Sequence, residues 1–145
     1  RSSAIRLVNT SMRVKAWEES FATVDISIIN LCSGTLKIVK AGASASYLVR
    51  GEQLKKLETT SLPIGIIQDI TPAIINVNLK PDDIIITASD GVIEDSLEII
   101  RQIAVANRKI SAEDMSVKMV KAVKKLADER YCDDITIVIS KLKKN

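Results

Sequence analysis

The order in which hydrophobic periodicities change along the chain constrains its fold more than any other feature of the sequence. Apolar residues spaced three to four apart at 2–12 predict a helix, and a succession of period-two or continuous apolar segments then predicts six strands. These strands are expected at residues 21–28, 36–41, 45–50, 53–58, 74–79 and 84–89. Two helices, at 95–104 and 111–126, precede a last strand at 135–142. Because strands and helices do not alternate, we expect an α+β fold of antiparallel sheets with helices packed on them, and not a doubly wound parallel sheet.

The composition is that of a globular chain without strong electrostatic bias. Its 145 residues are close to the roughly 150 of a typical domain, so we expect a single domain over 1–145. The 46% apolar content argues against disorder, and a net charge of +3 is too small to indicate a nucleic-acid partner. No apolar run reaches the roughly 18 residues of a spanning helix, so we expect no membrane contact by this segment.

The residue types leave carboxylates as the main source of chemistry. The sequence contains no histidine, which excludes a histidine base, acid or metal ligand. Cys32 and Cys132 lie far apart, in neither a CxxC nor a framework spacing, and we interpret them as cytosolic thiols. The pair Asp82 and Asp83 follows a proline, which favours a solvated turn over a pair of metal ligands.

Two further motifs place an aspartate where a strand meets a loop. Ser89-Asp90-Gly91 ends one expected strand, and its glycine lets the backbone turn or approach a ligand closely. Asp133-Asp134 directly precedes the last strand. If these two strands are neighbours, Asp90 and Asp133 converge. Carboxylates without histidine or thiolate partners suit a hard divalent ion such as Mg²⁺ or Mn²⁺.

Five motifs in a fixed order add a resemblance to a known family. They are Phe21-Ala22-Thr23-Val24-Asp25, Lys40-Ala41-Gly42-Ala43, Leu62-Pro63-Ile64-Gly65-Ile66, Ser89-Asp90-Gly91 and Asp133-Asp134-Ile135-Thr136. In this order the chain resembles the metal-dependent PPM (protein phosphatase 2C-like) serine/threonine phosphatases. Within them it is most similar to the catalytic domain of the stage II sporulation protein E group of spore-forming bacteria. The resemblance covers nearly all of the chain, from about residue 12 to 142.

The resemblance implies an antiparallel β-sandwich flanked by helices, with two Mn²⁺ or Mg²⁺ ions bound at one end of the sheets. It assigns Asp90 and Asp133 as metal ligands that act through metal-bound water, and it places Gly91 and Asp134 beside them as backbone or supporting residues. The implied reaction is hydrolysis of a phosphoserine on a regulatory protein, of the anti-sigma-factor antagonist type, in sporulation signalling. The implied location is a cytoplasmic domain, in a parent protein that membrane segments can anchor.

One departure from the family qualifies this expectation. The family has an upstream Asp-Gly loop whose aspartate bridges both metals, and this chain begins at Arg1, after the point where that loop would lie. We therefore expect an N-terminally truncated chain, the larger C-terminal part of a phosphatase domain, that is nearly inactive alone. A sheet edge left uncovered would favour a homodimer. The alternative is a regulatory or dimerisation module that keeps the sandwich fold without catalysis.

Overall fold

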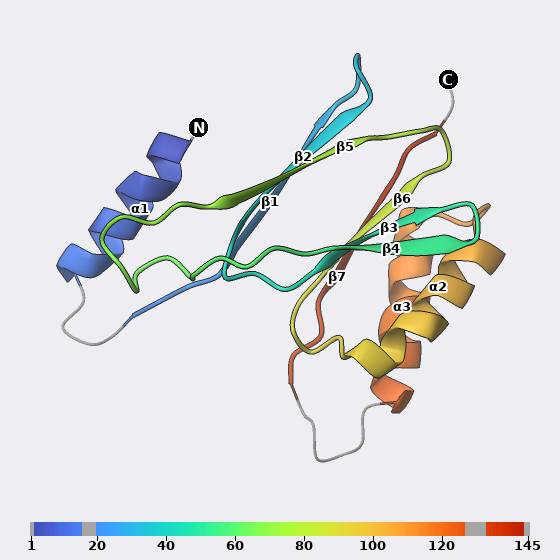
Figure 1. The fold of residues 1–145 in the computed structure, drawn as a ribbon. Coiled ribbons are helices and arrows are strands. Elements are labelled where there is room, and N and C mark those ends of the chain that lie inside the picture. Colours follow the sequence, from blue (N-terminus) through green and yellow to red (C-terminus); the bar gives the residue numbers. More distant parts are fainter. Residues whose placement is uncertain (1, 16–19, 127–132, 144–145) are drawn as a thin grey trace. The chain divides into compact units, whose positions relative to one another are not determined.

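The computed structural model describes residues 2–15, 20–126 and 133–143 (Figure 1). The contacts between residues divide the chain into two compact units. The first unit comprises Arg1–Ala43 and Thr59–Leu79, and the second comprises Ser44–Glu58 and Lys80–Asn145. Each unit holds one antiparallel sheet and the helix or helices that accompany it, and each is described in turn.

The first unit is a three-stranded sheet with one helix. Its elements are α1 (Ser2–Lys15), β1 (Val24–Asn30), β2 (Thr35–Ala41) and β5 (Ala73–Asn78), with the strands in the order β1-β2-β5. The β1–β2 hairpin turns at Gly34, whose φ is +65°, and the Asn30 side chain accepts bonds from two amides of the turn. Leu36 and Ile38 on the central strand β2 are completely buried. The alternation of buried and half-exposed residues along β2 is the pattern that a sheet with one covered face requires.

A buried asparagine fixes α1 to the rest of the first unit. The Asn9 amide donates to the carbonyl oxygens of Ile67 and Gln68, and its Oδ1 accepts a 2.7 Å bond from the amide of Gly65. Gly65 has a φ of +97°, and a Cβ there would lie 2.3 Å from the Ser20 carbonyl oxygen. Glycine is therefore required at position 65 by the close approach of this loop to the Ser20 backbone.

The second unit is a four-stranded sheet covered by two helices. It contains β3 (Ser46–Arg50), β4 (Gln53–Leu57), β6 (Ile84–Ala88) and β7 (Ile137–Lys141), in the order β4-β3-β6-β7, with η1 (Glu94–Ser96), α2 (Leu97–Ala106) and α3 (Ala112–Leu126). Figure 1 shows α2 and α3 side by side against this sheet. Ile86, Ile100, Met115 and Met119 are each fully buried in the core between sheet and helices. Burying such side chains contributes about 2 kcal/mol each.

The antiparallel sheets with flanking helices that the sequence predicts are confirmed, and the differences lie at element ends. Helix α1 continues to Lys15, beyond the end of the helix expected at 2–12. The apolar periodicity of α3 predicts that Leu126 faces inward, but its side chain is 49% exposed. Gly51, at the first central position of the turn between β3 and β4, has a φ of +55°, as a type II′ turn requires.

Candidate metal centre

The pairing of β6 with β7 places the two aspartate motifs at the same end of the sheet. The strands are antiparallel neighbours, with Ala88 opposite Ile137, and the pairing continues with a 3.0 Å bond from the Ser89 amide to the Thr136 carbonyl oxygen. Asp90 follows this last paired residue directly. The Asp133-Asp134 motif lies just before the start of β7. The neighbouring strands that convergence of the motifs requires are therefore present.

The hydroxyl of Ser89 joins the two motifs. Its Oγ donates a 3.0 Å bond to the Asp134 carbonyl oxygen and accepts a 2.9 Å bond from the Thr136 amide. Gly91 approaches the same carbonyl, because a Cβ on Gly91 would lie 2.7 Å from the Asp134 oxygen. The glycine is thus required by close packing of two backbones. Sequence reasoning missed Ser89, although a hydroxyl directly before the aspartate was a visible signal.

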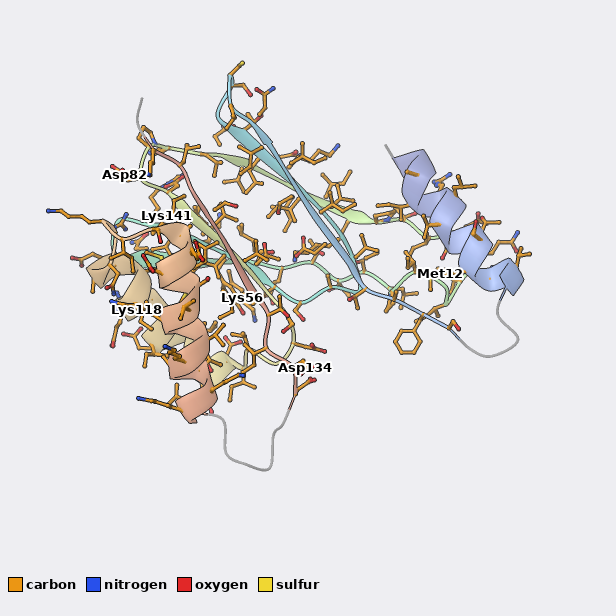
Figure 2. All side chains as sticks on the ribbon, turned by 180° about the vertical axis from the view of Figure 1, so that it is seen from behind. Met12, Lys56, Asp82, Lys118, Asp134 and Lys141 are labelled. Carbon is orange, nitrogen blue, oxygen red and sulfur yellow. The ribbon has the colours of Figure 1, made fainter. Side chains whose placement is uncertain are left out.

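The carboxylates of the site face solvent. Asp90, Asp133 and Asp134 are all exposed, and Figure 2 shows Asp134 at this end of the second unit. The Asp134 amide donates a 2.8 Å bond to Oδ1 of Asp133, which orients that carboxylate and leaves its second oxygen for another ligand. Oxygen donors of this kind fit Mn²⁺ or Mg²⁺. No group of three or more cysteine, aspartate or glutamate side chains that could hold a metal ion occurs among residues 2–15, 20–126 and 133–143.

The other acidic pair lies elsewhere and has a structural role. Asp83 precedes β6 at its opposite end, is only 2% exposed, and accepts bonds of 3.0 and 2.7 Å from Nε and Nη2 of Arg50. Burial would raise the pKa of Asp83, but the Arg50 guanidinium and the Lys80 amide hold it below its ordinary value. The solvated-turn interpretation is right for the exposed Asp82 and wrong for Asp83, which is a buried partner of arginine.

The cysteines and the lysines of α3 lie outside the candidate metal centre. Cys32 is an exposed free thiol, as expected, and Cys132 lies outside the described residues. Lys118, Lys121 and Lys125 are exposed on α3, as its amphipathic pattern predicts. Within the described part of the chain, no helix combines the length and the apolar character needed to cross a membrane.

Comparisons with known proteins identify the family. The family model of stage II sporulation protein E (SpoIIE) matches residues 1–143. Stage II sporulation protein E of Bacillus subtilis (strain 168) is 27% identical over 148 aligned positions, which cover 98% of this chain and 18% of that protein. The Priestia megaterium protein of the same name is also 27% identical, with 98% of this chain and 25% of that protein covered. The chain thus spans a quarter or less of the length of these relatives.

Solved structures agree with the family match. The structure of the PP2C phosphatase domain with a fragment of the regulatory domain of SpoIIE from Bacillus subtilis has a TM-score of 0.81 at 26% identity, covering 98% of this chain and 45% of that one. The phosphatase domain alone, presoaked with Mn, gives 0.70 at 25% identity, covering 99% and 66%. A bacterial serine phosphatase, 13% identical, shares the fold with a TM-score of 0.82, covering 99% and 68%. The chain therefore belongs to the stage II sporulation protein E family and has the fold of its PP2C phosphatase domain.

Proposed function

We propose that this chain carries the catalytic metal site of a protein serine phosphatase, which hydrolyses a phosphoserine on a regulatory protein. The observation that carries the proposal is the β6–β7 pairing, which puts Asp90 and the Asp133-Asp134 motif at one end of a sheet. Family membership and the likeness to the PP2C phosphatase domain of SpoIIE support the reaction class. With no histidine in the sequence, the chain itself offers carboxylates for this chemistry.

Asp90 and Asp133 are the residues that would hold Mn²⁺ or Mg²⁺, as one of two ions in the intact site. Such ions polarise a phosphoryl group and lower the pKa of a water. The protein's part is to fix the two carboxylates: the Asp134 amide orients Asp133, and the Ser89 hydroxyl holds the Asp134 backbone beside the Asp90 turn. Asp134 acts here through its backbone.

The substrate we propose is a phosphoserine on an anti-sigma-factor antagonist type of protein, within sporulation signalling. The support is the family, whose relatives are named for stage II of sporulation. The corresponding location is a cytoplasmic domain of the parent protein, which membrane segments outside this chain would anchor.

The test is phosphate release from a phosphoserine protein by the natural protein that contains this segment. We expect turnover to require Mn²⁺ or Mg²⁺ and to fall at least 100-fold in Asp90→Asn and in Asp133→Asn, because each removes a metal ligand. Asp82→Asn, an exposed aspartate at the other end of β6, is the matched control and should retain activity. Unchanged turnover in both ligand variants would refute the proposal and favour a non-catalytic module.

The isolated 145 residues should turn over substrate far more slowly than the natural protein. The reason is that we assign only Asp90 and Asp133 as ligands, and no group of three or more candidate ligand side chains occurs among the described residues, whereas a bridged pair of ions needs more ligands. Equal manganese-dependent rates for the two proteins would contradict this. Self-association through an uncovered sheet edge stays a prediction, and light scattering that reports a monomer at high concentration would overturn it.

A further inference from the structure

A basic groove lies at the end of the second unit opposite to the aspartate motifs. Its two adjoining hollows, of about 570 and 70 Å³, share Asp82, Asp83, Arg108 and Lys109. Residues 84–89, which include β6, separate Asp83 in the groove from Asp90, and the seven residue steps between them span roughly 23 Å at about 3.3 Å per residue. Figure 2 shows Asp82 and Lys141 at this end and Asp134 at the other.

Three connections frame the groove, and arginine side chains hold them together. Arg108, which follows α2, donates to the carbonyl oxygens of Asp82 and Gly51, in the turns before β6 and β4. Arg50 binds both carboxylate oxygens of Asp83. Lys141 on β7 donates a 2.6 Å bond to the Arg108 carbonyl oxygen. The groove therefore has a fixed shape, because each wall is bonded to a neighbouring element.

The excess positive charge of the chain is accounted for by the side chains that line this groove. Six cationic side chains and two carboxylates line the two hollows, namely Arg50, Lys80, Arg108, Lys109, Lys141 and Lys143 with Asp82 and Asp83. Without these eight side chains, the 21 Lys and Arg and the 18 Asp and Glu of the chain would be nearly balanced. Partial burial and the positive charges of Lys143 and Arg108 lower the pKa of Lys141, as a positive local potential requires.

We propose that this groove binds an acidic polypeptide segment of a partner protein, at a surface separate from the metal centre. The proposal does not depend on the phosphatase activity. The cations left for a partner are Lys80, Lys109 and Lys143, which are exposed and have no ion pair among the described residues. They stand on three different segments, so they suit several carboxylates spread along an extended chain.

The chemistry of the groove favours an acidic peptide over other anions. The two guanidinium groups that would grip a phosphate bidentately already donate to Asp83 and to backbone carbonyls, and lysines remain as separate point charges. None of the described residues lining the groove is aromatic, so single-stranded nucleic acid finds no stacking platform. The surface of a bilayer is flat, so it would not fill a concave hollow between turns, and we do not expect the groove to bind a membrane.

The test measures binding of a fluorescein-labelled peptide of ten glutamates by fluorescence anisotropy. We expect binding that weakens with added salt, and an affinity loss of about tenfold or more in the double variant Lys80→Glu, Lys109→Glu. The matched control, Lys121→Glu with Lys125→Glu, makes the same charge change on exposed α3 lysines and should cost less than about twofold. Lys80→Gln with Lys109→Gln, which adds no negative charge to the turn, should give an intermediate loss.

Three outcomes would overturn the proposal. They are absence of peptide binding by the unaltered chain, equal losses in the groove and α3 double variants, and tighter groove-dependent binding of a ten-nucleotide single strand or of anionic vesicles than of the peptide. Circular dichroism identifies variants that fail to fold, and the glutamine pair then decides the result. The metal-dependent activity of the natural protein is measured separately, so failure of either proposal leaves the other testable.

Discussion

Ser89 has the most specific role that the structure assigns to a single side chain at the candidate metal centre. Its hydroxyl donates to the Asp134 carbonyl oxygen and accepts from the Thr136 amide. These two bonds link the segment that follows β6 to the segment that precedes β7. Groups that hold metal ligands in place typically change metal affinity by about 10-fold to 100-fold when removed. We therefore predict that Ser89 acts as a positioning residue.

Ser89→Ala should raise the dissociation constant for Mn²⁺ about tenfold, because the Asp133-Asp134 backbone loses its bond to the Asp90 turn. Ser89→Thr keeps the hydroxyl and should bind Mn²⁺ with the affinity of the unaltered protein. Free Mn²⁺ counted by electron paramagnetic resonance gives the constant, and Ser116→Ala, which removes a hydroxyl bonded within α3, is the control. A loss of thermal stability with unchanged affinity would show that Ser89 is only structural.

The ion pair between the partly exposed Arg50 and the buried Asp83 should make the stability of the protein depend on pH. The pKa of Asp83 is lowered in the folded state, so its contribution to stability is present above the ordinary value near 3.8 and is lost as the pH falls through the lower folded value. Removing Arg50 leaves a carboxylate buried without its partner, which is costly only while that carboxylate is charged. The cost of the substitution therefore falls at acid pH.

We predict that Arg50→Met lowers the free energy of unfolding by about 2 kcal/mol at pH 7, a figure reduced from that of a fully buried pair because Arg50 is 38% exposed. At pH 3 the loss should be smaller, since Asp83 in the variant is protonated. Urea unfolding at both pH values measures the difference. Arg101→Met, which breaks the exposed pair with Glu98, should change stability far less than Arg50→Met does at pH 7, and equally little at either pH. An Arg50→Met loss that is the same at both values would contradict the account.

At the scale of elements, the β1–β2 hairpin contains an ion pair within its sheet. Asp25 and Lys40 are directly opposite in the register, and their side chains are paired. Lys40 is completely buried and Asp25 is 14% exposed. The hydroxyl of Ser61 donates to the Lys40 carbonyl oxygen and accepts from the Gly42 amide, which ties the loop after β4 to the end of β2. The pair thus lies where the hairpin meets this loop.

Lys40→Ala should lower the free energy of unfolding by about 3 kcal/mol, because it removes one partner of a buried ion pair. Lys37→Ala is the matched control, since Lys37 lies on the same strand with its side chain half-buried, and it should cost less than about 1 kcal/mol. Equilibrium urea unfolding measures both. Equal losses in the two variants would show that the Asp25–Lys40 pair contributes nothing specific.

Local sequence signals predicted the elements well because each depends on neighbours in the chain. The Ser111 start of α3 is an example: its hydroxyl accepts a 2.9 Å bond from the Asp114 amide three residues on. The positions of Gly51 and Gly65 were likewise predictable from turn chemistry. Element ends were less predictable, because a terminal residue such as Leu126 follows the helical pattern without having a core to face.

Features that depend on distant partners were not predictable from the sequence. Asp83 is buried because Arg50, 33 positions away, reaches it, and nothing in the local turn sequence indicates that contact. The role of Ser89 depends on a backbone carbonyl 45 positions away. The motifs around Asp90 and Asp133 made these residues candidates, but only the β6–β7 pairing shows that the two motifs lie at one end of a sheet.

At the scale of the whole molecule, we propose that Asp90 and Asp133 together hold one divalent ion. The most direct measurement is an NMR titration of the isotope-labelled chain with Mn²⁺, whose paramagnetism broadens signals near the bound ion. We predict that amide signals from 89–91 and 133–136 broaden first, and that Asp90→Asn or Asp133→Asn abolishes this while Asp82→Asn does not. Uniform broadening along the chain, or selective broadening that survives both ligand variants, would contradict the assignment of this metal centre.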